Sequence, residues 1–352
     1  MEAALFQWEH FLSGTGQLFC EFDIRKVERE DGMSKKSKVV MTSTGVPVHQ
    51  KPLKLRIWNH RGYYVMFLPV LIFLIIMHYW PMLGVRYSFY DYYVVRQPSF
   101  VGFKHFETMF GLPQFWTAFQ NTLILSIMKL LLTTVSSVVV SLFLNEMGNL
   151  FAKKTLQTII YLPHFMSWAV VASIFTLFLS ASSTGMLNGL LVDEWGLMSE
   201  KISFLEEPTL WRTIFYMINI WKETGWGTII FLATLSGINP ELYEAADIDG
   251  ATRMQKMRYV TMPALANTIL TVLILNLAKV MNMFESVFVL YNADVWTVSD
   301  VISTYIYRQT FANAVSNYGY STAVGLFKSL VGCGLVLFCN WLSKKVRGRG
   351  II

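Results

Sequence analysis

The sequence predicts an all-α integral membrane protein with six membrane-spanning helices. Of its 352 residues, 54% are hydrophobic and only 15% are charged, whereas a soluble domain carries about a quarter charged residues. Six segments have the roughly 20 predominantly apolar residues that a helix needs to cross the hydrocarbon core. The basic residues gather beside the ends of these segments rather than on one soluble face, which is the distribution of a membrane protein.

The six predicted spans are separated by loops of unequal length. They are Tyr63–Leu83, Thr122–Leu144, Thr158–Leu179, Thr213–Leu235, Leu265–Leu290 and Thr322–Leu342. Basic residues are concentrated in the short connections on one side of the membrane and are sparser in the longer loops on the other. The concentrated set is Lys51, Lys54, Arg56, Arg61, Lys153, Lys154, Arg253, Lys256, Arg258, Lys344, Lys345, Arg347 and Arg349. Because short cytoplasmic loops retain Lys and Arg, both termini are expected in the cytoplasm.

The segment before the first span has a different composition. Residues 1–54 are predicted to be a cytoplasmic N-terminal tail, partly disordered, and residues 55–350 the six-span transmembrane domain. Acidic Glu2 and Glu9 flank a short apolar stretch, so the tail lacks a signal-peptide pattern. The run that begins at Met33 has the composition of an ordinary cytoplasmic start, and residues 1–32 are expected to be a dispensable extension. The alternative is a short amphipathic surface helix in that extension.

The loop at residues 239–263 is charged and contains glycine, although it lies between two apolar spans. Asn239 is a favourable N-cap and Pro240 suits the first helical position, so a helix is expected to begin there. Leu242, Ala245, Ala246 and Asp249 follow helical spacing, and the small alanines would allow a partner surface to approach closely. Gly250 can end this helix by adopting a positive φ.

A second short helix, Ala251–Tyr259, is expected after that glycine, and Pro263 would open the fifth span. The segment combines Glu244-Ala245-Ala246 with Gly250, Val260, Met262 and Pro263 in a fixed register. This pattern resembles the EAA loop of bacterial ABC-importer permeases. The resemblance implies that Glu244, Ala245, Ala246, Asp249, Gly250 and Arg253 couple the protein to a separate ATPase. A plain capped helix–turn–helix between two spans is the alternative.

The resemblance covers nearly the whole of residues 55–350. The segments that carry it are Tyr63–Arg96, Val101-Gly-Phe-Lys-His-Phe, Gln120-Asn-Thr, Tyr161-Leu-Pro and Asn219-Ile-Trp-Lys. They are similar to sugar permeases of the MalF/LplB type, which implies the MalF-type permease fold with a cytoplasmic coupling helix. It also implies import of an oligosaccharide through the bacterial cell (inner) membrane by ATP-driven alternating access.

The same resemblance implies several partners. A second homologous permease would form a heterodimer with this chain, and an extracytoplasmic solute-binding protein would deliver the oligosaccharide. Two cytoplasmic ATPase subunits would bind ATP and Mg, so no cofactor is expected in this chain. A permease for a non-sugar solute is the alternative, and a secondary sugar transporter is a more distant one, which would show a longer set of spans and repeat symmetry.

Motifs for catalysis are absent from the sequence. There is no G-x-x-x-x-G-K-[ST] phosphate-binding loop and no G-x-S-x-G nucleophile motif. The three cysteines, Cys20, Cys333 and Cys339, follow neither metal-ligand nor disulfide spacing. The chain is therefore expected to be non-catalytic, to hold no metal, and to bind no nucleic acid despite its net charge of +6.

Polar residues within the spans are candidates for function because each charge there costs roughly 2.5–3.5 kcal/mol at the helix centre. One stripe lies on the fourth span and a second on the fifth, with Glu285 on the opposite face from Asn276. The predicted substrate-pathway residues are Tyr216, Asn219, Lys222, Glu223, Trp226, Asn276, Lys279 and Asn282. The stripes could line a hydrated path for a sugar, or they could pair with each other or with a partner permease.

Two single charges in other spans, Lys129 and Lys328, are expected to be structural. Lys222 and Lys279 weakly favour an acidic sugar. The long outer loop at Arg86–Gln120 is rich in aromatic residues, which suit either an interfacial belt or a docking surface for an external partner.

Overall fold

The computed structural model of the protein describes residues 38–41, 47–50, 57–93, 96–182, 185–312 and 317–347. The chain forms two compact units, Met1–Met82 and Leu83–Ile352, and each is described by itself. The described residues are mostly helical, which confirms the predicted all-α class.

The first unit contains a strand pair and the start of the first span. Strands β1 (Lys38–Met41) and β2 (Pro47–Gln50) pair antiparallel within the predicted N-terminal tail, residues 1–54. They are followed by helix α3 (Arg61–Leu74), the π-helical turn η1 (Ile75–Tyr79) and α4 (Trp80–Met82). The predictions for residues 1–32 fall outside the described residues.

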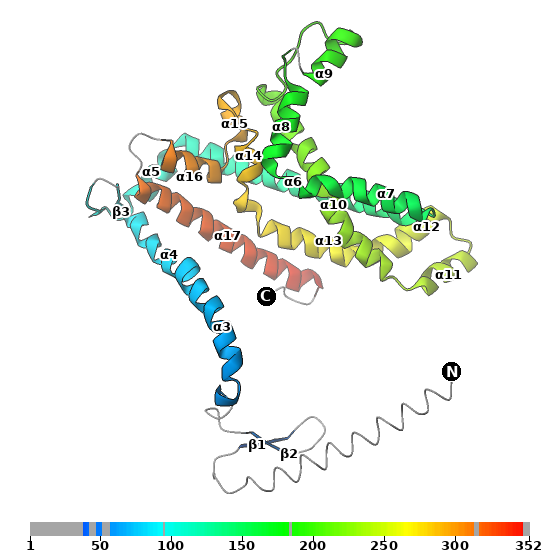
Figure 1. Ribbon diagram of the computed structural model, residues 1–352, viewed down its shortest axis with the longest axis horizontal. Coiled ribbons are helices and arrows are strands. Elements are labelled where there is room, and N and C mark those ends of the chain that lie inside the picture. The colour runs from blue at the N-terminus through cyan, green and yellow to red at the C-terminus, as the bar shows by residue number, and fades with distance from the viewer. Residues whose placement is uncertain are drawn as a thin grey trace. The chain divides into compact units, whose positions relative to one another are not determined.

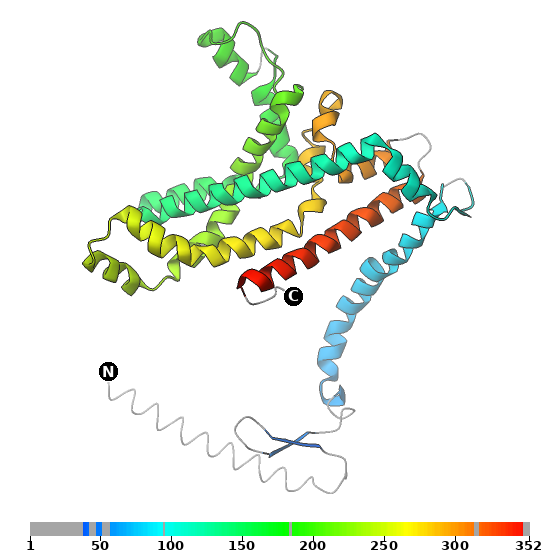
Figure 2. The same ribbon diagram turned by 180° about the vertical axis from the view of Figure 1, so that it is seen from behind.

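The second unit holds the remaining spans and the outer segments. Its elements are η2 (Leu83–Phe89), β3 (Tyr90–Asp91), β4 (Ser99–Phe100), α5 (Lys104–Gly111), α6 (Pro113–Glu146), α7 (Leu150–Tyr161), η3 (Leu162–Phe165), α8 (Trp168–Leu179), α9 (Met186–Asn188), η4 (Gly189–Glu194), α10 (Pro208–Ser236), α11 (Pro240–Ile248), α12 (Arg253–Lys256), η5 (Met257–Thr261), α13 (Met262–Leu277), η6 (Val280–Asn282), α14 (Glu285–Phe288), η7 (Ala293–Val295), α15 (Trp296–Ser299), α16 (Ile302–Phe311) and α17 (Tyr318–Arg347). Figures 1 and 2 show α6, α13 and α17 running alongside one another. Helices α11 and α12 lie at one end of this group, and α5 and α16 lie at the other.

Four helical runs among the described residues are long and apolar enough to cross a membrane. They are Arg61–Phe89, Pro113–Glu146, Arg253–Leu277 and Tyr318–Lys345, and a bent pair of helices would make a fifth. Helix α10 has 29 residues, enough to cross at 1.5 Å per residue, but it falls outside this apolar set. It contains the predicted polar stripe, and the count of six spans remains a prediction.

The third predicted span, Thr158–Leu179, is not one straight helix. Two helical runs, Leu150–Phe165 and Trp168–Leu179, cover it and meet at an angle of 101°. Pro163 lies in the 3₁₀ turn η3 between them, and the Ser167 hydroxyl caps α8 by accepting from the backbone N–H of Val170. A proline followed by a new N-cap ends one helix and starts another.

The fifth predicted span, Leu265–Leu290, is also interrupted. Helix α13 ends at Leu277, and residues 278–284 form a short 3₁₀ turn with irregular flanks before α14 begins. The Ser126 hydroxyl on α6 donates to the carbonyl of Val280 at 2.8 Å. Irregular backbone is tolerated at membrane depth where it is buried in protein or lines a cavity.

Helix α10 packs closely against α6 and α7 through small residues. An added Cβ at Gly225 would meet the carbonyl of Ile160, and one at Gly227 would meet the side chain of Ser137. The Ser137 hydroxyl donates to the carbonyl of Thr224 at 3.0 Å. Small residues let membrane helices approach one another, and the interhelical hydrogen bond adds to that packing.

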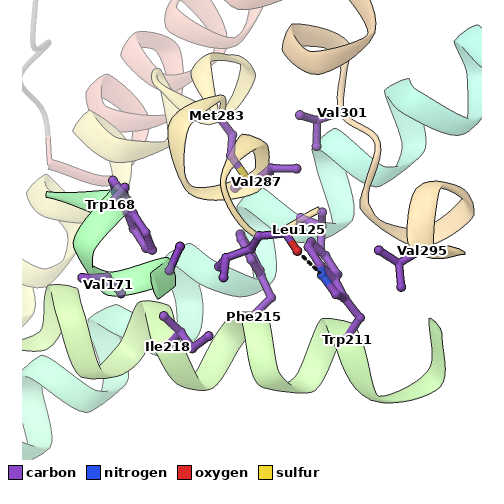
Figure 3. Packing of buried hydrophobic residues seen from close by; sticks show 12 residues of the cluster. Leu125, Trp168, Val171, Trp211, Phe215, Ile218, Met283, Val287, Val295 and Val301 are labelled. Carbon is purple, nitrogen blue, oxygen red and sulfur yellow. Dashed lines mark hydrogen bonds between the residues drawn. The ribbon is translucent and has the colours of Figure 1, made fainter. Parts of the chain in front are cut away.

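A buried apolar cluster joins α6, α8, α10 and the segment that follows α13. Figure 3 shows Trp211 and Phe215 of α10 pointing toward Leu125, Val287 and Val295. The Trp211 ring stacks on Phe215 with centroids 5.0 Å apart, and its indole N–H donates to the carbonyl of Leu290 at 3.0 Å. The cluster therefore anchors the irregular segment against α10.

Replacement of Trp211 by phenylalanine is expected to destabilise the protein by about 1–3 kcal/mol. The change leaves the buried carbonyl of Leu290 without the indole donor and removes part of a fully buried side chain. The midpoint of thermal unfolding of the detergent-solubilised protein would show the loss. Trp195→Phe is the control because that side chain is 63% exposed; equal midpoints for the two variants would contradict the assignment.

Candidate transport cavity and coupling loop

The coupling loop, residues 239–263, begins with the predicted cap. The Asn239 side-chain oxygen accepts from the backbone N–H of Glu241 at 3.1 Å, and Pro240 occupies the first turn of α11. Glu241 adds an acidic side chain near the positive end of the helix dipole. These local interactions explain why α11 forms at this position without any buried residue.

Gly250 ends α11 in the predicted way, with φ of +73°. The backbone N–H of Ala251 donates to the carbonyl of Ala246 at 2.9 Å, and that of Gly250 donates to Asp247 at 3.1 Å. This pair of hydrogen bonds is the Schellman motif, which requires a left-handed residue at the position of Gly250. Asp249 is the C-cap.

The second half of the loop is different from the expected separate helix. Helix α12 begins at Arg253, with Thr252 and Gln255 forming a reciprocal capping box. It then continues through the π-helical turn η5 directly into α13. Pro263 has no N–H to donate and crowds the preceding turn, and a wider π turn accommodates it without a break.

Two contacts join the halves of the loop. The Lys256 ammonium lies 2.6 Å from the Asp247 carboxylate, and the Tyr243 hydroxyl lies 3.0 Å from that of Thr261. The side chains of Glu244, Ala245 and Arg253 remain exposed, and Ala246 is half-buried. Large apolar side chains are exposed beside them: Leu242, Ile248 (87%), Met254 and Tyr259. The loop thus presents a preformed, partly apolar surface.

A cavity of about 750 Å³, lined by both polar and apolar side chains, lies beside the two helices that this loop connects. It is bounded by α6, by the start of α8, by α10, by α13 and by the irregular segment after α13. Its lining residues are Ser126, Lys129, Leu130, Thr133, Thr134, Ser137, Trp168, Glu223, Trp226, Gly227, Ile230, Phe231, Val272, Leu275, Asn276, Lys279, Val280, Asn282, Met283, Phe284, Glu285 and Ser286.

Five of the predicted pathway residues line this cavity: Glu223, Trp226, Asn276, Lys279 and Asn282. On α10 the lining begins at Glu223 and continues toward the coupling loop. The other predicted residues of this helix precede Glu223, and their side chains pack within the protein. Helical periodicity places a side chain on a face, but the neighbouring helices decide at which depth the space opens.

The three predicted residues outside the lining make contacts within the protein. Tyr216 packs against the buried apolar cluster. The Asn219 amide donates to the carbonyl of Phe215 at 2.7 Å. The Lys222 ammonium is buried at the bend of the third span and donates to the carbonyls of His164 at 2.9 Å and Met166 at 2.6 Å. Lys222 therefore makes its contacts within the fold and does not line this cavity.

Two charged residues that the sequence reasoning placed elsewhere do line the cavity. Lys129, expected to be structural, lies in the lining, and its ammonium is 5.7 Å from the centre of the Trp168 ring. Glu285, expected on the face opposite Asn276, is in the same lining. The interruption at residues 278–284 resets the helical phase, so angular positions counted from α13 no longer apply to α14. The isolated charge in an apolar span was the only sequence signal for Lys129.

His164, which is not itself a lining residue, contacts two side chains of the cavity wall. His164 lies on η3, where its Nδ1 is 3.3 Å from the Glu223 carboxylate. The His164 ring also stacks on Trp226, with centroids 4.9 Å apart and planes at 13°. His164 thus contacts both Glu223 and Trp226 of α10, and the sequence reasoning did not identify it.

Among the described residues, no group of three or more His, Cys, Asp or Glu side chains could hold a metal ion. The cavity instead offers amides, hydroxyls, ammonium groups, carboxylates and aromatic faces. These groups can bind and release a polar solute, and their arrangement indicates no covalent chemistry.

Comparison with known proteins identifies the family. Residues 137–348 match the model of the binding-protein-dependent transport system inner membrane component. The chain is 39% identical over 292 residues to Protein LplB of Bacillus subtilis, covering 82% of this chain and 90% of that protein. It is 37% identical over 306 residues to the polygalacturonan/rhamnogalacturonan transport system permease protein YteP of the same organism, covering 86% and 94%.

A solved structure agrees with the sequence relatives. The crystal structure of a bacterial alginate ABC transporter, in complex with an alginate pentasaccharide-bound periplasmic protein, contains a chain 37% identical to this one. The match has a TM-score of 0.78 and covers 86% of this chain and all of that chain. The predicted permease family and fold are confirmed, and the role of such a subunit is transport rather than catalysis. The chain belongs to the family of inner membrane components of binding-protein-dependent transport systems.

Proposed function

We propose that this chain moves an oligosaccharide into the cell by ATP-driven alternating access, with the 750 Å³ cavity as part of the path. One observation carries the proposal: α10 and α13, which both contribute to the cavity lining, are the two helices that the coupling loop joins. A force on the exposed surface of α11 therefore acts on both of these helices through a single connection.

The partners follow from the family. In an ABC importer, a permease of this family works with separate ATPase subunits. A short, rigid surface helix such as α11 can dock in a groove of an ATPase subunit. Closure of two cytoplasmic ATPases, which bind ATP and Mg, would rotate the attached helices as rigid bodies. A second, homologous permease would complete the path as a heterodimer, and an extracytoplasmic solute-binding protein would deliver the sugar. Both termini and the coupling loop then lie in the cytoplasm, as the basic residues indicate.

The cavity supports a sugar as the cargo. Asn276, Asn282 and the hydroxyls of α6 supply hydrogen-bonding groups, and Trp226 offers an aromatic face to a pyranose ring. The names of the relatives agree, because YteP is a permease for polygalacturonan or rhamnogalacturonan and the solved transporter imports alginate.

Removal of these groups is expected to slow transport without loss of assembly. Asn276→Ala and Trp226→Ala should each lower uptake by the reconstituted importer several-fold, up to about tenfold, because a net hydrogen bond or ring contact contributes about 0.5–1.5 kcal/mol. Uptake of labelled oligosaccharide into proteoliposomes measures the effect, and co-purification of the ATPases reports assembly.

The chain provides matched controls for both changes. Asn267 is an exposed asparagine on α13 and Trp221 an exposed tryptophan on α10, and neither lines the cavity. Asn267→Ala and Trp221→Ala should retain uptake. Uptake that is unchanged in Asn276→Ala and Trp226→Ala, or that falls equally in the controls, would remove the cavity from the path.

A further inference from the structure

We propose that the cavity selects oligosaccharides that carry carboxylate groups, and that Lys129 and Lys279 bind those carboxylates. The inference rests on the proposed function, since it names the class of sugar that the same cavity accepts. It differs from the expectation from the sequence, in which Lys222 and Lys279 weakly favoured an acidic sugar.

The predicted spans contain four lysines, and the structure separates them into two kinds. The protein itself satisfies Lys222, through carbonyls at the bend of the third span, and Lys328, whose ammonium donates to the Ser303 hydroxyl at 3.0 Å. Lys129 and Lys279 both line the cavity. In the part of the chain that the structure describes, neither forms an ion pair with a carboxylate.

A charge at membrane depth is costly, at roughly 2.5–3.5 kcal/mol on insertion scales. Lys222 and Lys328 recover part of this cost through hydrogen bonds within the fold. Lys129 is half-buried in the wall, with the Trp168 ring as its aromatic neighbour, and Lys279 is exposed to the cavity at the point where the fifth span unwinds. Two ammonium groups that face one polar space without a carboxylate partner match an anionic cargo.

The cavity also contains two carboxylates, Glu223 and Glu285, and neither forms an ion pair with these lysines within the described residues. Glu223 is near enough to Lys129 for an electrostatic interaction, and its carboxylate also lies 3.3 Å from Nδ1 of His164. Glu285 remains available at the first turn of α14, and a carboxylate can accept hydrogen bonds from sugar hydroxyls. A uronic acid presents both a carboxylate and hydroxyls, so it can use the lysines and Glu285 together, whereas a neutral sugar leaves both lysines unpaired.

Binding to the purified permease–ATPase complex, without the solute-binding protein, tests this selectivity. The probes are trigalacturonate, trimannuronate and their neutral methyl esters, compared by saturation-transfer NMR or equilibrium dialysis. The wild-type complex should bind at least one acid form more tightly than its ester. Lys129→Gln and Lys279→Gln should each weaken binding of that acid about tenfold or more, because a hydrogen bond to a charged group contributes about that factor, and should leave ester binding nearly unchanged.

Lys328→Gln is the matched control, since it removes an intramembrane lysine that does not line the cavity. Equal binding of acids and esters by the wild type would overturn the inference. So would equal losses for acid and ester in the two cavity variants, which is the result expected if these lysines pair with the second permease. In either case, uptake of neutral oligosaccharides by the full importer would leave the proposed function standing. Failure of every sugar, acid and neutral, in uptake as well as in binding would overturn both.

Discussion

Replacement of Gly250 by proline is expected to abolish transport while the chain remains inserted in the membrane. Gly250 has φ of +73°, whereas a proline ring holds φ near −65°. Its N–H also donates to the carbonyl of Asp247, and proline has no N–H. The end of α11 would therefore unwind, and the surface that receives force from the ATPase would lose its fixed orientation relative to α13.

Paired assays separate uncoupling from unfolding in this variant. In proteoliposomes containing the full importer, uptake should fall to background, and the ATPase activity should no longer rise when the loaded binding protein is added. Gly250→Asn is the control because asparagine tolerates a left-handed conformation, and it should retain most of the transport. Uptake by Gly250→Pro within a factor of two or so of Gly250→Asn would contradict the coupling role.

A second variant avoids any change in backbone geometry. Glu244 is exposed on α11, so Glu244→Lys reverses a surface charge without removing a contact that the structure records. Loss of coupling in this variant would show that the ATPase contacts the side chains on the surface of α11. Normal coupling in Glu244→Lys together with loss in Gly250→Pro would restrict the role of the loop to its backbone.

Replacement of Lys222 by methionine is expected to destabilise the protein by about 2–6 kcal/mol. Lys222 is 4% exposed, and its ammonium donates to the carbonyls of His164 and Met166. Loss of a donor to a buried carbonyl costs about 1–3 kcal/mol for each group left unsatisfied. These two carbonyls lie where the third span turns by 101°, and the bend should loosen.

The expected result is a lower midpoint of thermal unfolding in detergent and greater protease cleavage near residues 163–167. Lys328→Met is the control, since that ammonium donates to a single hydroxyl, and its effect should be below about 1.5 kcal/mol. A variant Lys222→Met that unfolds like the wild type but transports poorly would return Lys222 to the substrate path.

Features that depend on near neighbours in the chain could be predicted from the sequence. The cap at Asn239, the proline at the first turn and the glycine at the helix end act within one or two turns, and the structure has each of them. The apolar runs and the register of Glu244, Gly250 and Pro263 were enough to indicate the family, which the comparisons confirm. The coupling role itself stays a prediction.

Features that depend on interrupted helices could not be predicted in this way. Periodicity assumes a continuous helix, and the interruption at residues 278–284 changes the phase, which brings Glu285 to the same cavity as Asn276. Likewise, the sequence places Lys222 in a polar stripe and Lys129 alone in an apolar run, but neither pattern tells which lysine lines the cavity. The bend of the third span, formed by residues about 60 positions away from Lys222, supplies carbonyl groups that accept hydrogen bonds from Lys222. Among the described residues, Lys129 has no such carbonyl partners, and it lines the cavity.

The sequence by itself determined the membrane class, the family and the local architecture of the coupling loop, because hydropathy, capping and turn chemistry act over short distances along the chain. Only the tertiary structure decided which polar side chains meet in the cavity. That outcome depends on where helices break and how closely they pack, as at Gly225 and Gly227. Burial of a charge is decided by groups brought together from several helices, and the cost of leaving it unsatisfied makes that arrangement specific.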